Sequence, residues 1–249
     1  MRLMDQFEQS GAVLFRWRSY APLFIAPVLM AALVESVGIE QLLGDAIDDT
    51  WKGICLFLST AGLAIRWFVI GTAHPGTSGR NVKMQRAEVL NTTGAYSIVR
   101  NPLYLGNFIA MLGIALATMI WWFVLIVCLA YWLYIERIIL AEEVFLSEKF
   151  GDSYLDWAGR TPVFIPNLGH WQAPARRFEI KSVLKREYNG LLAVATAFLV
   201  IESIMDLLLE GEPFRGWLME DIVPVTFFGI SAAAFLILRT LKKKTSFLG

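Results

Sequence analysis

Apolar residues gather along the chain into blocks that are too long and too apolar for ordinary core helices. A helix needs about 20 such residues to cross a bilayer. The blocks lie at 20–38, 51–71, 103–119, 120–137, 190–209 and 221–239. The third and fourth run together, which predicts a tight hairpin that turns between Thr118 and the Trp121–Trp122 pair at a membrane interface. The pattern predicts an all-α polytopic membrane helix bundle with about six transmembrane helices.

The polar remainder fits this class of protein. Only 18% of residues are charged, against roughly 25% in soluble domains. The formal net charge is zero, which argues against a nucleic-acid partner. The chain has two Cys and two His residues, and no spacing among them is typical of a metal site. We therefore expect a membrane partner, no nucleic acid and no metal.

Lys and Arg residues are distributed unevenly among the connections between the blocks. Most lie in the N-terminal tail, in 72–102, in 137–189 and in the C-terminal tail, whereas 39–52 and 210–220 are acidic. Cytoplasmic connections carry the excess of basic residues in membrane proteins. We therefore predict that both termini and the two long connections are cytoplasmic.

Intramembrane charges need partners, because their insertion is costly. We expect Arg66 to pair with Glu35 or Glu202, or to reach the interface, and Glu202 to form a structural pair with Asp206. Residues 174–189 place apolar side chains on one stripe between basic ones, and this predicts a separate interfacial helix on anionic lipid.

A helix that leaves the membrane is predicted over 138–157, and Glu136 and Glu143 share one of its faces. The neighbours Glu142 and Glu143 point about 100° apart, so they cannot both address one ligand atom equally. Phe150–Gly151 is typical of a helix end. The alternative interpretation is a solvated helix with surface charges. Residues 160–166 are expected to run as an extended cover strand.

The stretch YSIVRNPLYLG, at 96–106, opens the third block. Pro102 restricts Asn101 to extended geometry and suits the first turn of a helix, which places Arg100 at the membrane surface beside Tyr96 and Tyr104. Aromatic residues there can serve as a simple interfacial anchor. Anchoring does not require this order of Arg, Asn, Pro, Tyr and Gly, so the stretch is a candidate site.

These motifs together resemble the isoprenylcysteine carboxyl methyltransferase and phospholipid methyltransferase superfamily. The order is G-x-Y-x-x-x-R-[HN]-P-x-Y-x-G, an apolar hairpin, E-E-x-x-L-x-x-x-F-G-x-x-Y and V-x-x-P. Its elements here are Gly94–Tyr96, Arg100–Gly106, Glu142–Glu143, Leu146, Phe150–Gly151, Tyr154 and Val163–Pro166. The resemblance covers roughly 62–167. Many members have His where this chain has Asn101, and this argues against a histidine base.

The resemblance implies an integral membrane enzyme that binds S-adenosylmethionine on the cytoplasmic side and methylates a lipid or lipophilic small molecule. The catalytic residues it implies are Arg100, Asn101, Tyr104 and Glu143. The cofactor-binding residues it implies are Gly94, Tyr96, Arg100, Asn101, Tyr104, Glu142, Glu143 and Tyr154. Arg100 suits an anionic group, and a glutamate suits the ribose diol or the amine of the cofactor.

The expected organisation is an N-terminal tail with the first spans at 1–61, a methyltransferase core at 62–167, and an interfacial helix with two extra spans at 168–249. The expected location is a bacterial inner membrane, with the site facing the cytoplasm. Two alternatives stay open. One is an NADPH-dependent reductase of the sterol type, whose motif plan is similar, and the other is a non-catalytic membrane protein that retains the fold.

Overall fold

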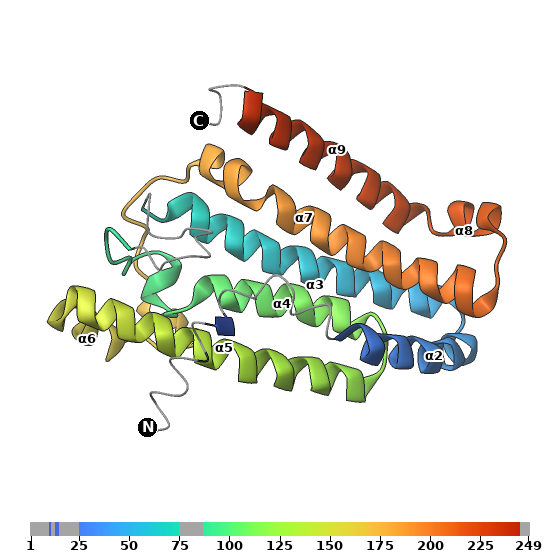
Figure 1. The fold of residues 1–249 in the computed structure, drawn as a ribbon, viewed down its shortest axis with the longest axis horizontal. Coiled ribbons are helices and arrows are strands. Elements are labelled where there is room, and N and C mark those ends of the chain that lie inside the picture. Colours follow the sequence, from blue (N-terminus) through green and yellow to red (C-terminus); the bar gives the residue numbers. More distant parts are fainter. Residues whose placement is uncertain (1–9, 11–12, 15–24, 75–86, 245–249) are drawn as a thin grey trace. The chain divides into compact units, whose positions relative to one another are not determined.

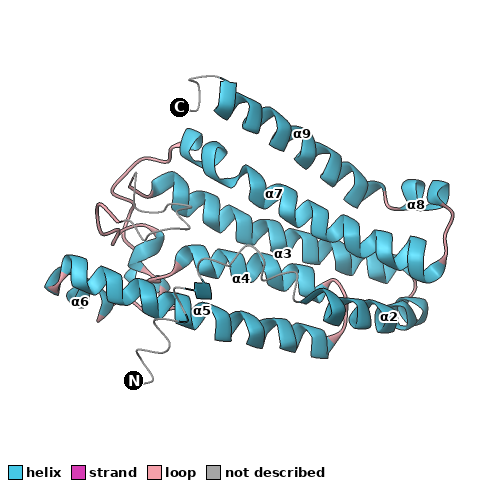
Figure 2. Ribbon diagram, viewed as in Figure 1, coloured by secondary structure: helices cyan, strands magenta, loops and turns pink. Residues whose placement is uncertain are grey.

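Helices make up most of the computed structural model, which describes residue 10 and residues 13–14, 25–74 and 87–244 (Figures 1 and 2). The longer helices are α2 (Ala26–Leu43), α3 (Asp45–Thr72), α4 (Pro102–Leu116), α5 (Trp121–Phe150), α7 (Ile180–Glu202) and α9 (Ile222–Lys244). The shorter ones are α6 (Asp152–Ala158), α8 (Phe214–Glu220), the 3-10 turns η2 (Ala95–Ser97) and η3 (Leu168–His170), and the π-helix η4 (Ser203–Glu210). Within these described ranges no strand forms, and the prediction of an all-α fold is confirmed.

The chain forms two compact units. Unit 1 comprises Met1–Phe24, Phe68–Leu105 and Cys128–Glu179, and unit 2 comprises Ile25–Trp67, Gly106–Val127 and Ile180–Gly249. Helices α3, α4 and α5 contribute residues to both units. The predicted functional division at 62 and 167 stays a prediction.

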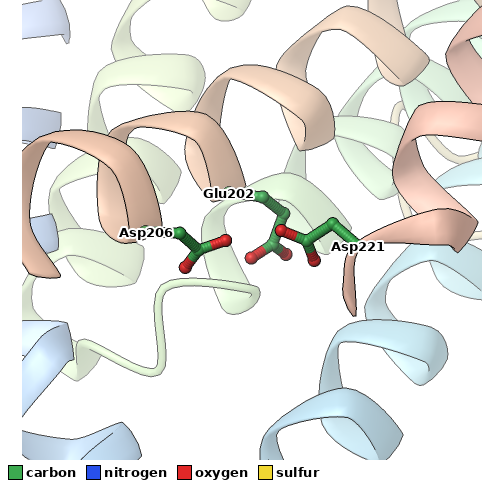
Figure 3. Close-up of side chains that lie close together, drawn as sticks. All are labelled: Glu202, Asp206 and Asp221. Atoms are coloured by element: carbon green, nitrogen blue, oxygen red, sulfur yellow. The ribbon is translucent and has the colours of Figure 1, made fainter. Parts of the chain in front are cut away.

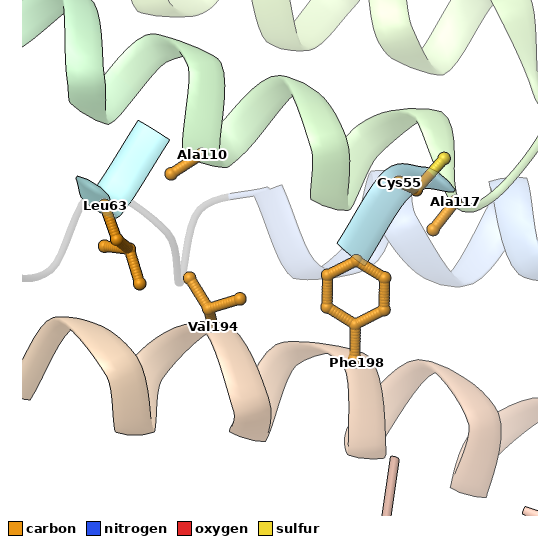
Figure 4. Close-up of a cluster of buried hydrophobic side chains, with 6 residues drawn as sticks. All are labelled: Cys55, Leu63, Ala110, Ala117, Val194 and Phe198. Atoms are coloured by element: carbon orange, nitrogen blue, oxygen red, sulfur yellow. The ribbon is translucent and has the colours of Figure 1, made fainter. Parts of the chain in front are cut away.

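Unit 2 has a core in which α3, α4 and α7 meet. Its buried side chains are Cys55, Leu63, Ala110, Ala117, Val194 and Phe198 (Figure 4). Glycines let α3 and α4 approach closely: a Cβ on Gly62 would lie 2.5 Å from the backbone N of Ala110, and one on Gly106 would lie 2.7 Å from Cγ of Arg66. Small residues are the usual means of close helix packing in membranes. Gly106, the last residue of the RNPLYLG motif, therefore has a packing role.

Unit 1 has a smaller core on α5, formed by Ile135, Ile138 and Ile139 with partly buried neighbours that include Tyr131 and Val163. After α5 the chain turns at Gly151, whose φ of +53° is in the left-handed region that favours glycine. The predicted helix end at Phe150–Gly151 is confirmed. Residues 160–178, named the cover segment from here on, follow α6 and are irregular except for η3, so the expected extended strand does not form.

Within the part of the chain that the structure describes, five helices are long and apolar enough to cross a membrane: α2, α3, α5, α7 continued by η4, and α9. The remaining predicted span, the third along the chain at 103–119, corresponds to α4, whose 15 residues extend about 22 Å and fall short of a hydrocarbon core of about 30 Å. The prediction of a polytopic membrane bundle is confirmed, and α4 differs from the other predicted spans in its length.

The separate interfacial helix predicted over 174–189 is wrong. Residues 174–179 are not helical, and the first helical residue, Ile180, begins α7, which continues through the apolar block to Glu202. The stripe used for the prediction therefore belongs partly to the first turns of a long apolar helix and partly to the cover segment.

Candidate functional site

All the predicted site residues lie in unit 1. Their centre is an ion pair in which Nη1 of Arg100 lies 2.9 Å from Oε1 of Glu143, with 17% and 26% of the two side chains exposed. The backbone N–H of Arg100 donates to the carbonyl of Pro162 at 2.8 Å. Pro102 begins α4 directly after this stretch, as the sequence predicts. The motif arginine is thus fixed by its own backbone against the cover segment and by its charge against α5.

The neighbouring carboxylate has a different partner. The hydroxyl of Tyr104 donates to Oε1 of Glu142 at 2.8 Å. The hydroxyl of Tyr131, also on α5, donates to the backbone carbonyl of Tyr104 at 2.6 Å. Because adjacent helical residues point about 100° apart, Glu142 and Glu143 serve separate tyrosine and arginine contacts. Of the two carboxylates, Glu142 therefore accepts a hydrogen bond from a neutral phenol, and Glu143 pairs with a charged guanidinium.

Asn101 points to the cover segment. Its Nδ2 donates to the carbonyl of Val163 at 3.1 Å. An asparagine amide cannot act as a proton acceptor in the way a neutral histidine can. The geometry gives Asn101 the task of holding the cover segment, and the catalytic role predicted for it stays a prediction.

Gly94 and Tyr96 contribute through their backbone groups. Gly94 has a φ of +62°, and its N–H donates to the carbonyl of Gln172 at 3.0 Å, in an isolated bridge. The carbonyl of Tyr96 accepts from Nε1 of Trp157 at 3.1 Å, and the hydroxyl of Ser97 accepts from the N–H of Gln172 at 2.9 Å. These bonds join the motif stretch to both α6 and the cover segment.

Trp157 and Ser97 are therefore part of the site's framework, although the sequence analysis did not single them out. Both are buried. Trp157 follows the F-G-x-x-Y motif by three residues, and this position beside a motif is the one signal in the sequence that could have drawn attention to it.

Among the described residues of unit 1, three buried polar side-chain atoms make no hydrogen bond: Nε of Arg100, Oε1 of Glu143 and the hydroxyl of Tyr154. The contact between Arg100 and Glu143 is thus an attraction of charges without hydrogen-bond geometry. Only 3% of Tyr154 is exposed. Burial, together with the Glu143 carboxylate, raises the pKa of Tyr154 to about 12 against the opposing effect of Arg100, so the phenol is a neutral donor at physiological pH.

Unsatisfied buried polar atoms are costly and rare in folded proteins, and each one asks for an explanation. A guanidinium donor, a carboxylate acceptor and a neutral phenol match the carboxylate, the amine and the diol of S-adenosylmethionine. The residues present fit this cofactor, and Arg100, Glu143 and Tyr154 are the ones that would hold it.

A second group of charges lies in unit 2. Glu202, Asp206 and Asp221 bring carboxylate oxygens within 4.8 Å of one another (Figure 3). Nζ of Lys52 lies 2.6 Å from both Glu202 and Asp48. The predicted structural pair of Glu202 and Asp206 is thus part of a larger cluster in which the lysine supplies the positive charge next to Glu202.

Arg66 has partners other than the two predicted ones. Its Nε and Nη2 donate to the two carboxylate oxygens of Glu187, each at 2.8 Å, and its Nη1 donates to Oδ1 of Asn107 at 2.7 Å. Glu35 instead accepts from Nε1 of Trp122. The expected pairing of Arg66 with Glu35 or Glu202 is therefore wrong. Its partner is Glu187, which belongs to the long helix α7.

Comparison with known proteins supports an integral membrane protein. The phospholipid methyltransferase family profile matches residues 50–153. This match, over less than half of the chain, confirms the resemblance to the isoprenylcysteine carboxyl methyltransferase and phospholipid methyltransferase superfamily that the sequence shows. The matched segment contains all the predicted site residues except Tyr154.

Curated relatives cover part of the chain. The nickel-cobalt-cadmium resistance protein NccN of Alcaligenes xylosoxydans xylosoxydans is 34% identical over 123 residues, which are 49% of this chain and 54% of the relative. The cobalt-zinc-cadmium resistance protein CzcN of Cupriavidus metallidurans is 33% identical over the same length, with the same coverage. The protein-S-isoprenylcysteine O-methyltransferase of Schizosaccharomyces pombe is 34% identical over 84 residues, 34% of this chain and 36% of the relative. The chain thus spans about half of the two bacterial relatives, and no solved structure shows a significant match.

Proposed function

We propose that unit 1 binds S-adenosylmethionine and transfers its methyl group to a lipid or lipophilic acceptor at the cytoplasmic face of a bacterial inner membrane. The observation that carries the proposal is the meeting of Arg100, Glu143 and Tyr154, each with a buried polar atom that makes no hydrogen bond. The family assignment and the methyltransferase among the relatives support it. The basic connections on one side support the cytoplasmic orientation.

The residues of unit 1 would act mainly by binding and orienting. When bound, the cofactor supplies an activated methyl group on a sulfonium. Arg100 would bind its carboxylate, while Glu143 and Tyr154 would bind its amine or its diol. Holding donor and acceptor in line is the main contribution that a protein makes to such a displacement. The cover segment, bonded along the motif stretch, would exclude water.

An amine acceptor must lose a proton, whereas an oxyanion need not. The hydroxyl of Tyr104 and Oε1 of Glu142, 2.8 Å apart, offer a place for that proton. A carboxylate or phosphate acceptor would leave this pair in a positioning role only. The pair therefore makes the amine and oxyanion classes distinguishable by mutation.

Calorimetric binding of S-adenosylhomocysteine to detergent-purified protein tests the proposal. We expect binding by the wild type, a loss of at least about tenfold in Glu143→Gln, which corresponds to 1.4 kcal/mol, and no change in Glu148→Gln, an exposed control on the same helix. Binding of NADPH without S-adenosylhomocysteine would support the reductase alternative. Binding of neither, in detergent and in vesicles, would support a non-catalytic protein.

The acceptor class is tested by incubating vesicles of bacterial lipid with radiolabelled S-adenosylmethionine. We expect label in the lipid fraction and a product heavier by one CH2 group. If Tyr104→Phe abolishes transfer while cofactor binding persists, the acceptor is an amine. If transfer persists, the acceptor is an oxyanion.

A further inference from the structure

The cover segment has an unusual composition for an exposed part of a protein. From 157 to 178 it contains Arg160, Arg176 and Arg177 and neither Asp nor Glu. It also presents large apolar side chains to the outside. The exposed fractions are 81% for Ile165, 74% for Leu168, 50% for Trp171 and 51% for Phe178.

The segment is attached to the last turns of a candidate membrane span. Nη1 of Arg176 donates to the carbonyl of Ala73 at 2.9 Å, directly after α3 ends. The N–H of Glu179 donates to the carbonyl of Gly71 at 2.8 Å. The rings of Trp171 and Phe68 have centroids 6.0 Å apart. Because α3 is long and apolar enough to cross a bilayer, these contacts place the segment where such a helix reaches the membrane surface.

A second contact joins the segment to α5, another candidate span. The ring of Phe164 meets Trp132 edge to face, with centroids 5.5 Å apart. Val163 packs beside Ile135 and Ile138. Inner apolar residues of the segment therefore cover spanning helices, while Ile165 and Leu168 are largely exposed and Trp171, which contacts Phe68, is half exposed.

We propose that the cover segment is an interfacial anchor that rests on an anionic lipid surface. Its outward apolar residues would enter the boundary between headgroups and acyl chains, and the exposed Arg160 and Arg177 would meet lipid phosphates, whereas Arg176 is held by Ala73 and Glu179. An exposed apolar patch with basic residues and a Trp is typical of such a surface. The absence of acidic residues from 157 to 178 complements a negative membrane.

The anchor also has a consequence for the site, which rests on the proposed function. In the cover segment, the carbonyl of Pro162 accepts from the N–H of Arg100, and the carbonyl of Val163 accepts from Nδ2 of Asn101. The N–H of Asn167 donates to the carbonyl of Ile98 at 2.9 Å. Docking on lipid would therefore hold the motif stretch in place. A lipophilic acceptor would reach the site from the leaflet on which the segment lies.

Nitroxide labels test the anchor directly. In the full chain with Cys55→Ala and Cys128→Ala, single labels are placed at Ile165→Cys and Leu168→Cys, with Asp156→Cys on α6 as an exposed control. The chain is reconstituted in vesicles of phosphatidylglycerol and phosphatidylcholine. We expect a several-fold higher ratio of oxygen to nickel-chelate accessibility at 165 and 168 than at 156.

Three results would overturn the proposal. Equal nickel-chelate accessibility at all three positions would place the segment in water. Protection from both reagents at 165 and 168 would mean that protein covers it. A ratio that does not fall in pure phosphatidylcholine would remove the role assigned to the arginines. The labels report depth whether or not the chain transfers methyl groups, so these outcomes are separate from those of the calorimetry.

Discussion

Unit 1 and unit 2 each contain a partly buried arginine paired with a glutamate, and the two pairs differ. In unit 2, Arg66 donates three hydrogen bonds of 2.7–2.8 Å to Glu187 and Asn107. In unit 1, Arg100 touches Glu143 at one charge contact, and its Nε has no partner. Only the second arginine belongs to the family motif.

The difference shows why a buried charge does not by itself identify a site. A guanidinium whose donors are used by the protein contributes to the fold and has little left for a ligand. A guanidinium with a buried, unused donor is incomplete without one. A buried guanidinium donor that makes no hydrogen bond, next to a phenol and a carboxylate, is therefore the better indicator of a ligand site. Substitutions can test this distinction.

Removing one partner of the unit 2 pair should have the largest effect. Glu187→Ala leaves Arg66 without its carboxylate and should lower the free energy of unfolding by about 3–5 kcal/mol. The midpoint of thermal unfolding in detergent measures this. The double variant Arg66→Met with Glu187→Met should recover most of the loss. A single variant as stable as the wild type would show that the pair is not structural.

Gly106→Ala should come next. Its Cβ would lie 2.7 Å from Cγ of Arg66 and 2.8 Å from the carbonyl of Gly62, so the cost should be about 1–3 kcal/mol. Gly53→Ala is the matched control on α3, because nothing lies within 4 Å of the new Cβ. It should leave stability unchanged or raise it by about 0.5–1 kcal/mol. Equal midpoints of thermal unfolding for the two variants would contradict the close packing.

Tyr154→Phe should separate binding from stability in unit 1. The hydroxyl has no hydrogen-bond partner, so its removal should not lower the unfolding midpoint. It should weaken S-adenosylhomocysteine binding by about 0.5–1.5 kcal/mol, the net value of one hydrogen bond. Tyr131→Phe loses a hydrogen bond of 2.6 Å to the carbonyl of Tyr104. It should therefore lower the unfolding midpoint more than it weakens S-adenosylhomocysteine binding. Unchanged affinity in Tyr154→Phe would remove that residue from the site.

The smallest effect concerns pH. The pKa of Tyr154 is raised from 10 to about 12, so the neutral phenol contributes stability that is fully present below pH 10 and is lost as pH rises through about 12. The tyrosinate absorbance of the wild type minus that of Tyr154→Phe should therefore rise near pH 12. A difference signal centred near pH 10 would mean that the phenol is solvated.

The sequence predicts the helical architecture well, because bilayer-length apolar blocks leave few alternatives. It also predicts that Glu142 and Glu143 address different partners, because adjacent helical residues point about 100° apart. The pairing of Arg100 with Glu143 is seen only in the structure. The roles of these residues in catalysis remain to be tested by the experiments above.

The sequence could not predict side-chain partners that depend on tertiary packing. Glu187 stands among basic residues at the end of the predicted interfacial helix, although it lies within the long helix α7 and is buried. The prediction of an interfacial helix over 174–189 was wrong for the same reason, since periodicity does not show where one helix begins and another segment ends. Trp157 and the bonds of the cover segment depend on the turn at Gly151, whose place the sequence predicts but whose direction no local pattern specifies.

Helix α5 fixes the distance between the contact with the cover segment and the ion pair of the site. Trp132, which contacts the cover segment, and Glu143, which pairs with Arg100, lie on one unbroken helix. Each residue inserted between them would move the carboxylate by about 1.5 Å and turn it by about 100°. The number of residues between these two positions therefore decides whether both contacts can form. Relatives and engineered variants should vary the residue types along this stretch without changing its length.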